Sequence, residues 1–343
     1  MSNVGWQRVR GHEKLVLAFE QVVKCGRLAH AYLFTGPQGI GKRLLAGELA
    51  RALLCEASQS RLEACGVCAS CALVDAGAHP DLFTAARPED ALELPIEVIR
   101  ELCLNLGLKP ARGRHKIAIL DDADDLNDAS ANCFLKTLEE PPPGSVLILI
   151  GTSAERQLPT VVSRCQLIRF APLSETLVAE LLRAHGMTDD AQIQRLARLS
   201  GGSMGQAMAL ADPSLWEFRR SMVEGLTRPE IDSVGLARQW MQFLEEAGKE
   251  ASVQRPRAAL VLRLVIEFLQ DALRLQVGGL PRLAEPEDLR LLHELVKRAD
   301  TDRLLELLER CLEADMQIDR RVQLVLVVEA LLDAVGQKMS AAV

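Results

Sequence analysis

The sequence predicts a doubly wound α/β domain followed by an entirely helical region. Before about residue 172, three short and nearly continuous apolar runs alternate with helical stretches, and no such run follows. The runs span 30–36, 116–122 and 145–153. Runs of this length and composition suit parallel strands that are buried on both faces. We therefore expect a parallel sheet with helices between its strands, including 42–54 and 129–139.

The second half of the chain carries only helical signals. Short helices are expected from about 173 until Gly201-Gly202, and Asp212-Pro213 then supplies an N-cap with proline in the first turn. Because 343 residues exceed what one core usually supports, we predict several domains. They are an α/β domain (1–172), a small helical lid (173–212) and a helical domain (213–343). The helical breaks are expected near Pro229, Pro256, Gly278-Gly279 and Pro286.

Composition restricts the function classes. A formal charge of −7 and a pI of about 5.5 argue against a protein that coats DNA through phosphate contacts alone. No signal-like segment opens the chain and no run of about 18 apolar residues occurs, so we expect a cytoplasmic protein without membrane contact. Cytosolic thiols stay reduced, so nine cysteines do not predict disulfides. Five are scattered and are expected to be small buried hydrophobes: Cys25, Cys103, Cys133, Cys165 and Cys311.

The other four cysteines are clustered within residues 55–71. Cys55, Cys65, Cys68 and Cys71 are separated by nine, two and two residues. Four thiolates at such spacing can form the closed tetrahedral shell of structural zinc, and we predict one zinc per chain. An iron–sulfur cluster is the alternative. The nearby segment 79–81, His-Pro-Asp, is interpreted as a structural turn because the metal shell is already full.

The segment 36–43, GPQGIGKR, follows the first predicted strand and opens a helix. Gly36, Gly41 and Lys42 match the phosphate-binding loop, in which backbone N–H groups and a lysine surround phosphate. The motif should continue with Ser or Thr, whose hydroxyl ligates magnesium. Arg43 stands there and cannot ligate a cation. We therefore expect ATP binding to be weak or absent.

The second predicted strand run ends in Asp121-Asp122. Acidic residues in this place normally orient magnesium and the attacking water, the second usually being glutamate. Asp122 is one methylene shorter than glutamate and would hold its carboxylate too far back. The alternative is that Asp121, Asp122, Asp124 and Asp125 form a solvated acidic turn. Both interpretations predict impaired catalysis.

Together these residues resemble the bacterial DNA polymerase III clamp-loader family, a branch of the AAA+ ATPases. The resemblance is carried by the cysteine cluster and by 26–42, 76–83, 131–144 and 158–166. It implies an AAA+ domain with a zinc-binding insertion, a helical lid and a C-terminal collar. It also implies a five-membered ring with gamma/tau and delta subunits, which places a sliding clamp on primed DNA as part of the DNA polymerase III holoenzyme.

The departures from the family pattern resemble its delta-prime branch, a rigid stator without ATP turnover of its own. Motor subunits keep the hydroxyl, an Asp-Glu pair and a lid arginine, whereas this chain has Arg43, Asp121-Asp122 and Gly205. The resemblance gives Arg164, in Ser163-Arg164-Cys165, the role of a finger in a neighbour's ATP site. Thr152 takes the first sensor position.

Three alternatives remain open at this point. The chain could be a gamma/tau-like ATP-hydrolysing motor of the same machine, or a zinc-dependent DNA-binding module on an ATPase-like scaffold. Arg164 could also be only one half of a surface ion pair, an interaction worth little.

Overall fold

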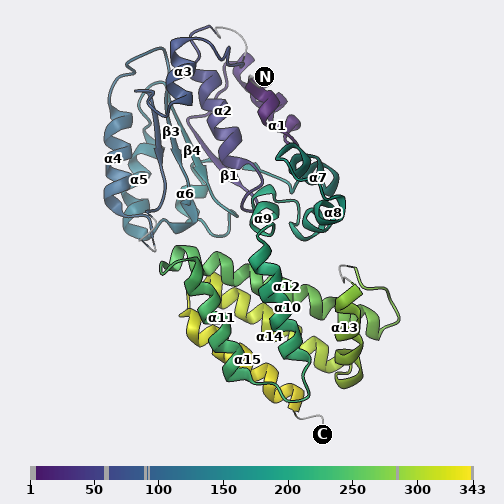
Figure 1. The fold of residues 1–343 in the computed structure, drawn as a ribbon. Coiled ribbons are helices and arrows are strands. Elements are labelled where there is room, and N and C mark those ends of the chain that lie inside the picture. Colours follow the sequence, from purple (N-terminus) through teal and green to yellow (C-terminus); the bar gives the residue numbers. More distant parts are fainter. Residues whose placement is uncertain (1–4, 58–61, 89–90, 92, 283–285, 341–343) are drawn as a thin grey trace. The chain divides into compact units, whose positions relative to one another are not determined.

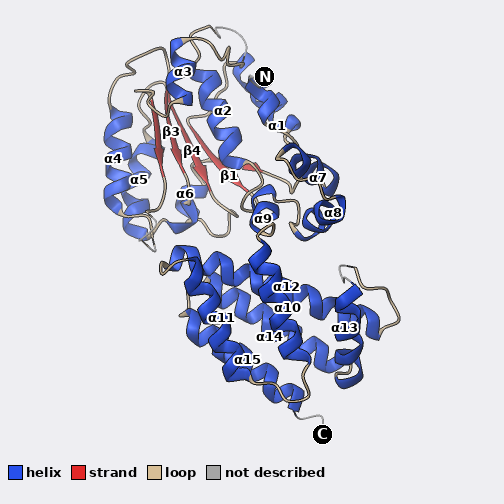
Figure 2. Cartoon of the chain, viewed as in Figure 1, coloured by secondary structure: helices blue, strands red, loops and turns tan. Residues whose placement is uncertain are grey.

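The computed structural model describes residues 5–57, 62–88, 91, 93–282 and 286–340. The chain divides into two compact units, Met1–Ala209 and Leu210–Val343. Unit 1 holds every strand of the described chain, and unit 2 is helical (Figures 1 and 2). No helix in the described ranges is long and apolar enough to cross a membrane.

Unit 1 is built on a five-stranded, fully parallel sheet of order β2-β3-β4-β1-β5. Its strands are β1 (Ala31–Thr35), β2 (Leu82–Ala85), β3 (Lys116–Leu120), β4 (Ser145–Ile150) and β5 (Gln166–Arg169). The predicted parallel sheet is confirmed, and its three predicted strands are the fully buried central ones. The two edge strands were missed because their side chains are only partly buried and form no continuous apolar run.

Helices cover both faces of the sheet. They are α1 (Glu13–Lys24), α2 (Lys42–Leu54) and α3 (Ala69–Asp75) on one face, and α4 (Ile96–Gly107), α5 (Asp128–Glu139) and α6 (Pro159–Val162) on the other. Alternate residues of β1 face opposite layers. Phe34 packs among α1 and α2, whereas Leu33 packs with Phe134 of α5. Short 3-10 turns occupy Gly5–Arg8 and Ala123–Asp125.

Three further helices complete unit 1: α7 (Glu175–Ala184), α8 (Asp190–Leu199) and α9 (Met204–Ala209). Ser174 and Asp189 cap the first two by accepting hydrogen bonds from backbone N–H groups in the first turn. Helix α8 ends before Gly201-Gly202, as the sequence predicts. The assignment of these helices to a separate lid domain stays a prediction.

Unit 2 consists of helices α10 to α15. Their bounds are α10 (Pro213–Thr227), α11 (Ser233–Ala247), α12 (Ala251–Gln276), α13 (Pro286–Arg298), α14 (Thr301–Asp319) and α15 (Leu324–Ser340). Asp212 caps α10 through the backbone N–H of Ser214, with Pro213 in the first turn. The break expected near Pro256 is misplaced: it falls at 248–250, and Pro256 lies inside α12. Only one turn precedes Pro256, so little helix is disrupted by its missing N–H.

Candidate nucleotide site and cysteine cluster

The loop between β1 and α2 has the backbone of a phosphate-binding loop. Gly36 and Gly41 have φ of 144° and 102°, which favour glycine. A Cβ on Gly36 would lie 2.6 Å from the carbonyl oxygen of Phe170. The glycines at these positions are therefore required by the conformation as well as by the motif.

The Lys42 ammonium is hydrogen-bonded to the loop that precedes it in the chain. Its Nζ donates to the carbonyl oxygens of Gly36 (2.6 Å) and Pro37 (2.7 Å), and the residue is buried. Burial lowers the pKa of the Lys42 ammonium, while the charges of Asp124 and Asp121 oppose that shift. A phosphate would have to displace these two hydrogen bonds to reach the lysine.

Arg43 stands where the phosphate-loop motif has its magnesium-ligating hydroxyl. Arg43 Nη1 lies 3.5 Å from Asp121 Oδ2, so the guanidinium pairs with the carboxylate that would otherwise face a metal ion. Asp122 follows with a left-handed φ of 53°. Burial, and next the charge of Asp121, raise the pKa of the Asp122 carboxyl.

Thr152 is held by Asp124, a residue that the sequence placed only in a possible solvated turn. The Thr152 hydroxyl and N–H both donate to Asp124 Oδ2, at 2.5 and 2.8 Å. Gln157 Nε2 donates to Asp124 Oδ1. The alternative of a solvated acidic turn is wrong for Asp124 and Asp125, because Asp125 is likewise paired with Arg87 at 2.7 Å. Their sequence offered no signal beyond an acidic run.

The segment that carries Gly205 lies directly on the phosphate loop. The Gly205 N–H donates to the Gly39 carbonyl (3.0 Å), and the Ser203 hydroxyl donates to the Gln38 carbonyl (2.7 Å). A Cβ added to Gly205 would lie 2.9 Å from the Gly39 Cα. This arrangement therefore has no room for any side chain at position 205, and an arginine there would have to separate the two segments.

Arg164 lies after α6 and is half-buried. Its guanidinium donates to Glu139 Oε1 at 2.9 Å from Nε, and Nη1 donates to the Thr160 carbonyl at 2.8 Å. Glu139 ends helix α5 and is itself half-exposed. In the single chain, Arg164 is thus one half of a surface ion pair, which is cheap to break.

The four clustered cysteines converge in space. Their sulfur atoms all lie within 4.8 Å of one another, and Cys55 Sγ is 3.9 Å from Cys68 Sγ. Zinc–sulfur bonds of about 2.3 Å in a tetrahedron imply sulfur separations of about 3.8 Å. Disulfides would need about 2.05 Å. The cluster therefore fits a metal shell of four thiolates.

Backbone N–H groups point at the cluster's sulfur atoms. Cys65 N–H donates to Cys55 Sγ, and Cys71 N–H donates to Cys68 Sγ. N–H groups of Val67 and Cys68 lower the pKa of the Cys65 thiol to about 6. Such donors stabilise the thiolate form that binds metal. By contrast, burial raises the pKa of Cys71 to about 12, a value for the protein without metal.

The His-Pro-Asp segment supports the cluster from outside. Asp81 is fully buried and accepts hydrogen bonds from the N–H groups of Ala111 and Arg112 at 2.8 and 2.7 Å. His79 Nε2 lies 3.2 Å from the Ser70 hydroxyl, on the helix that carries Cys71. The interpretation of this segment as a structural turn agrees with these contacts.

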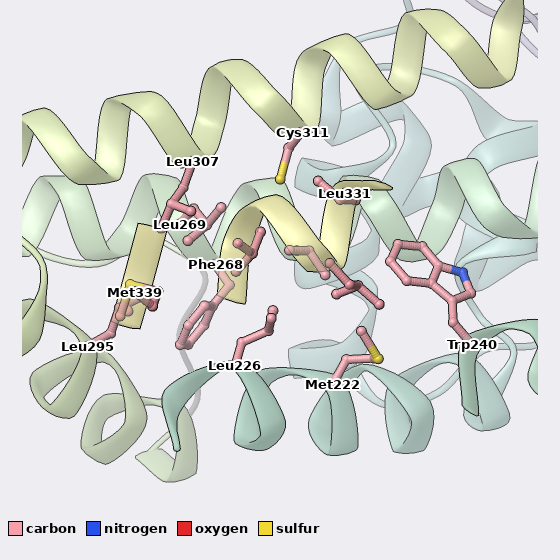
Figure 3. Close-up of a pocket in the computed structure, with 13 residues that line it drawn as sticks. Met222, Leu226, Trp240, Phe268, Leu269, Leu295, Leu307, Cys311, Leu331 and Met339 are labelled. Carbon is pink, nitrogen blue, oxygen red and sulfur yellow. The ribbon is translucent and has the colours of Figure 1, made fainter. Parts of the chain in front are cut away.

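The remaining cysteines do not form a second cluster within the described ranges. Cys25 is exposed at the end of α1, so its expected burial is wrong: the helix ends there at the surface. Cys311 is buried and points from α14 into an enclosed apolar cavity of about 20 Å³ in unit 2 (Figure 3). Burial raises its pKa to about 12. A space of one water lined by leucines, phenylalanine and tryptophan is a packing gap, not a ligand site.

Comparison with known proteins identifies the family of this chain. A sequence model described as "DNA polymerase III, delta subunit" matches residues 11–174. The chain is 35% identical over 270 residues to DNA polymerase III subunit delta' of Escherichia coli (strain K12), covering 78% of this chain and 75% of that protein. The chain belongs to the DNA polymerase III delta' family.

Other relatives agree with the delta' assignment. DNA polymerase III subunit delta' of Pseudomonas aeruginosa is 39% identical over 219 residues, which cover 62% of this chain and 66% of that protein. The tau subunit of Escherichia coli is 34% identical but shares only 32% of its own length. A gamma subunit-related protein of Thermotoga maritima aligns with 94% of this chain and 99% of its own at 15% identity and a TM-score of 0.47. That structural likeness is too low to add to the sequence relatives.

Proposed function

We propose that this chain is the non-hydrolysing delta' subunit of a DNA polymerase III clamp loader, which helps place the sliding clamp on primed DNA. The observation that carries the proposal is the pairing of Arg43 with Asp121. Where a working phosphate loop holds magnesium between a hydroxyl and an acid, this chain holds a guanidinium that cannot be deprotonated in a protein. Membership in the delta' family supports the same conclusion.

Two further features oppose ATP turnover. Lys42 is satisfied by the loop's own carbonyl groups, and the backbone of Gly205 occupies the space beside Gly39. Nucleotide binding through Gly36, Gly41, Lys42, Asp121, Asp122 and Thr152 is therefore weak or absent. Binding would require the loop to exchange internal hydrogen bonds for phosphate contacts, without magnesium to offset the phosphate charge.

The remaining architecture follows from the family resemblance. Residues 1–172 form the AAA+ domain, with a single structural zinc held by Cys55, Cys65, Cys68 and Cys71. Residues 173–212 form the lid. The helices from 213 onward form a collar that packs against the collars of gamma/tau and delta subunits in a five-membered ring.

Arg164 acts outside its own chain. It leaves Glu139 in the assembled ring and places its guanidinium at the γ-phosphate of a neighbouring subunit. Releasing an exposed ion pair costs about 0–1 kcal/mol. An arginine that stabilises transition-state charge in trans contributes about 10³–10⁵ in rate in other phosphoryl-transfer systems. The cost of release is therefore small beside the expected gain.

The test of this function is a loader rebuilt from purified subunits with and without this chain. We expect clamp loading on primed DNA to require the chain, and the chain alone to hydrolyse ATP no faster than a buffer control. ATPase activity of the isolated chain that disappears in Lys42→Ala would contradict the proposal and identify a gamma/tau-like motor. Clamp loading that proceeds equally well without the chain would also contradict it.

The zinc-dependent DNA-binding module is tested in the same preparation. We expect the isolated chain to show no tight, salt-dependent affinity for duplex or primed DNA, because its net charge is −7. Affinity that falls steeply with salt and is lost with the metal would favour that alternative.

A further inference from the structure

A large groove lies at the amino edge of the sheet in unit 1, at the opposite end of the strands from the phosphate loop. Its volume is about 1010 Å³, and His30, His115 and Ser145 line it at the starts of β1, β3 and β4. Cys55 and Ser70 of the cysteine module form part of its wall. The nucleotide site and Arg164 do not contribute to this groove, so it calls for a separate explanation.

The rim of the groove is positively charged. Lys24, Arg112 and Arg114 are exposed and line it, whereas Glu56 is its sole carboxylate among the described lining residues. Glu56 is already engaged by Arg112 Nη2 at 3.2 Å and by the Ser70 hydroxyl at 3.0 Å. Arg114 makes no side-chain hydrogen bond or ion pair within the described chain. A net positive groove on a chain of charge −7 is a local departure that favours an anionic ligand.

The floor of the groove is aliphatic. Val23, Leu28, Leu53 and Leu62 line it, together with the three prolines of 141–143. The described lining residues include no Phe, Tyr or Trp. Proteins that bind single-stranded nucleic acid rely on aromatic side chains for base stacking. An aliphatic floor with a basic rim instead matches a peptide that carries both carboxylates and aliphatic side chains.

The groove also has uncovered backbone. Ser145 lines it, but the Ser145 hydroxyl oxygen is itself buried, so it offers nothing to a ligand in the groove. Gly26 and Gly113 also line the groove, and a Cβ added to either would meet no atom within 4 Å, so their backbone is uncovered. Uncovered backbone of this kind lets an extended peptide approach closely.

We propose that this groove binds an acidic, aliphatic peptide segment of a partner protein. Its aliphatic side chains lie on the leucine and proline floor, and its carboxylates pair with Lys24, Arg112 and Arg114. At about 1010 Å³ the groove equals or exceeds the upper range of small-molecule pockets, about 300–1,000 Å³, which suits an extended chain better than a metabolite. The cysteine module then serves as a wall of a peptide site.

The test measures binding of labelled probes to the full zinc-loaded chain by fluorescence anisotropy. The probes are a 12-residue peptide alternating Asp or Glu with Leu, the same peptide with Lys in place of the acids, and a 12-nucleotide oligo(dT). We expect the acidic peptide to bind saturably and the other two probes not to do so. Preference for oligo(dT) or for the lysine peptide, or absence of saturable binding by the acidic peptide, would overturn the proposal.

Matched variants locate the binding site. Arg112→Glu with Arg114→Glu should weaken the acidic peptide about tenfold or more, the loss expected for about 1.4 kcal/mol. Lys14→Glu with Arg198→Glu makes the same charge change on exposed residues of unit 1 outside the groove and should leave most of the affinity. Zinc content and thermal melting of every variant establish that the fold is intact. Equal losses in the two pairs would overturn the proposal, because binding would then follow net charge alone.

Discussion

The two ends of the parallel sheet differ in how many of their polar and charged side chains are already paired within the chain. At the carboxyl end, where open α/β sheets usually bind ligands, Lys42 is bonded to the loop and Arg43 to Asp121, and Gly205 lies against Gly39. At the amino end, Lys24 and Arg112 pair with Glu20 and Glu56, whereas Arg114 has no ion-pair partner among the described residues. The ligand site that this fold class predicts is thus occupied by contacts within the chain itself. The groove at the amino end still offers Arg114 to a ligand.

Under the proposed function, this difference explains how an ATPase fold can persist without ATP turnover. A phosphate loop whose groups are satisfied by the protein still holds β1, α2 and the segment at Gly205 together. The contacts that oppose ATP binding are therefore also contacts that join these segments. Under the proposed function, this chain's contribution to catalysis is confined to Arg164, a residue on the surface of the same unit.

The largest effect is expected from the metal cluster at the amino end. Cys68→Ser removes one of four thiolates, and structural zinc binding is folding free energy, about 10–16 kcal/mol in small peptides. We expect zinc to fall from one per chain to near zero. The melting temperature of unit 1 should fall by about 10 °C or more, the shift that about 4 kcal/mol produces in a domain of this size.

Elemental analysis and calorimetry check this prediction. Cys25→Ser is the control, since Cys25 is exposed and lies outside the cluster. Protein purified without added metal that contains iron, or none at all, would contradict the zinc assignment. A Cys68→Ser protein that melts like the Cys25→Ser control would show that the metal is not structural.

An intermediate effect is expected where the Gly205 segment meets the phosphate loop. Gly205→Ala places a Cβ 2.9 Å from the Gly39 Cα, and overpacking of this kind costs about 1–3 kcal/mol. Gly47→Ala is the matched control, because it lies inside α2 with open space around it and should be neutral or stabilising by up to about 1 kcal/mol. Urea unfolding of the two variants measures the difference. Equal stabilities would mean that the Gly205 segment does not rest on the loop.

The smallest effect concerns the carboxyl of Asp122. Its pKa is raised in the folded protein by burial and by Asp121, so the folded state holds the proton more tightly than the unfolded state. Its deprotonation therefore lowers stability as the pH rises above the ordinary value of 3.8 and through the folded pKa.

Asp122→Asn removes the cost of holding a charged carboxylate in a partly buried place. Asparagine also tolerates the left-handed backbone at this position. We expect a gain on the order of 0.5 kcal/mol at pH 7 and none below about pH 3. Unfolding free energies measured across this pH range check the sign. A loss of stability at neutral pH would show that the Asp122 carboxylate is a favourable partner in the folded state.

The sequence predicted the features that depend on local pattern. Continuous apolar runs located the central strands, glycine spacing located the phosphate loop, and cysteine spacing predicted the convergence of four sulfur atoms. Local patterns could not predict the Gly39–Gly205 contact, because it joins residues far apart in the chain through backbone atoms alone. A solvated turn at Asp124 stayed one of two open interpretations, because an acidic run does not reveal that Thr152 and Gln157 donate to one of its members. The groove could not be predicted from the sequence, because separate loops at the amino ends of the strands build it.

The most direct measurement is the steady-state, DNA-stimulated ATPase rate of a loader rebuilt with Lys42→Ala or with Arg164→Ala, with gel filtration confirming that each ring assembles. We expect Lys42→Ala to leave the rate nearly unchanged, because this chain's own site does not turn over ATP. Arg164→Ala should lower the rate by less than about 2-fold, the share of one bordering site among several, and Arg164→Lys should restore little because lysine lacks the planar fork. The opposite result, a rate lost with Lys42 and kept without Arg164 in intact rings, would contradict the central claim and identify the chain as a motor.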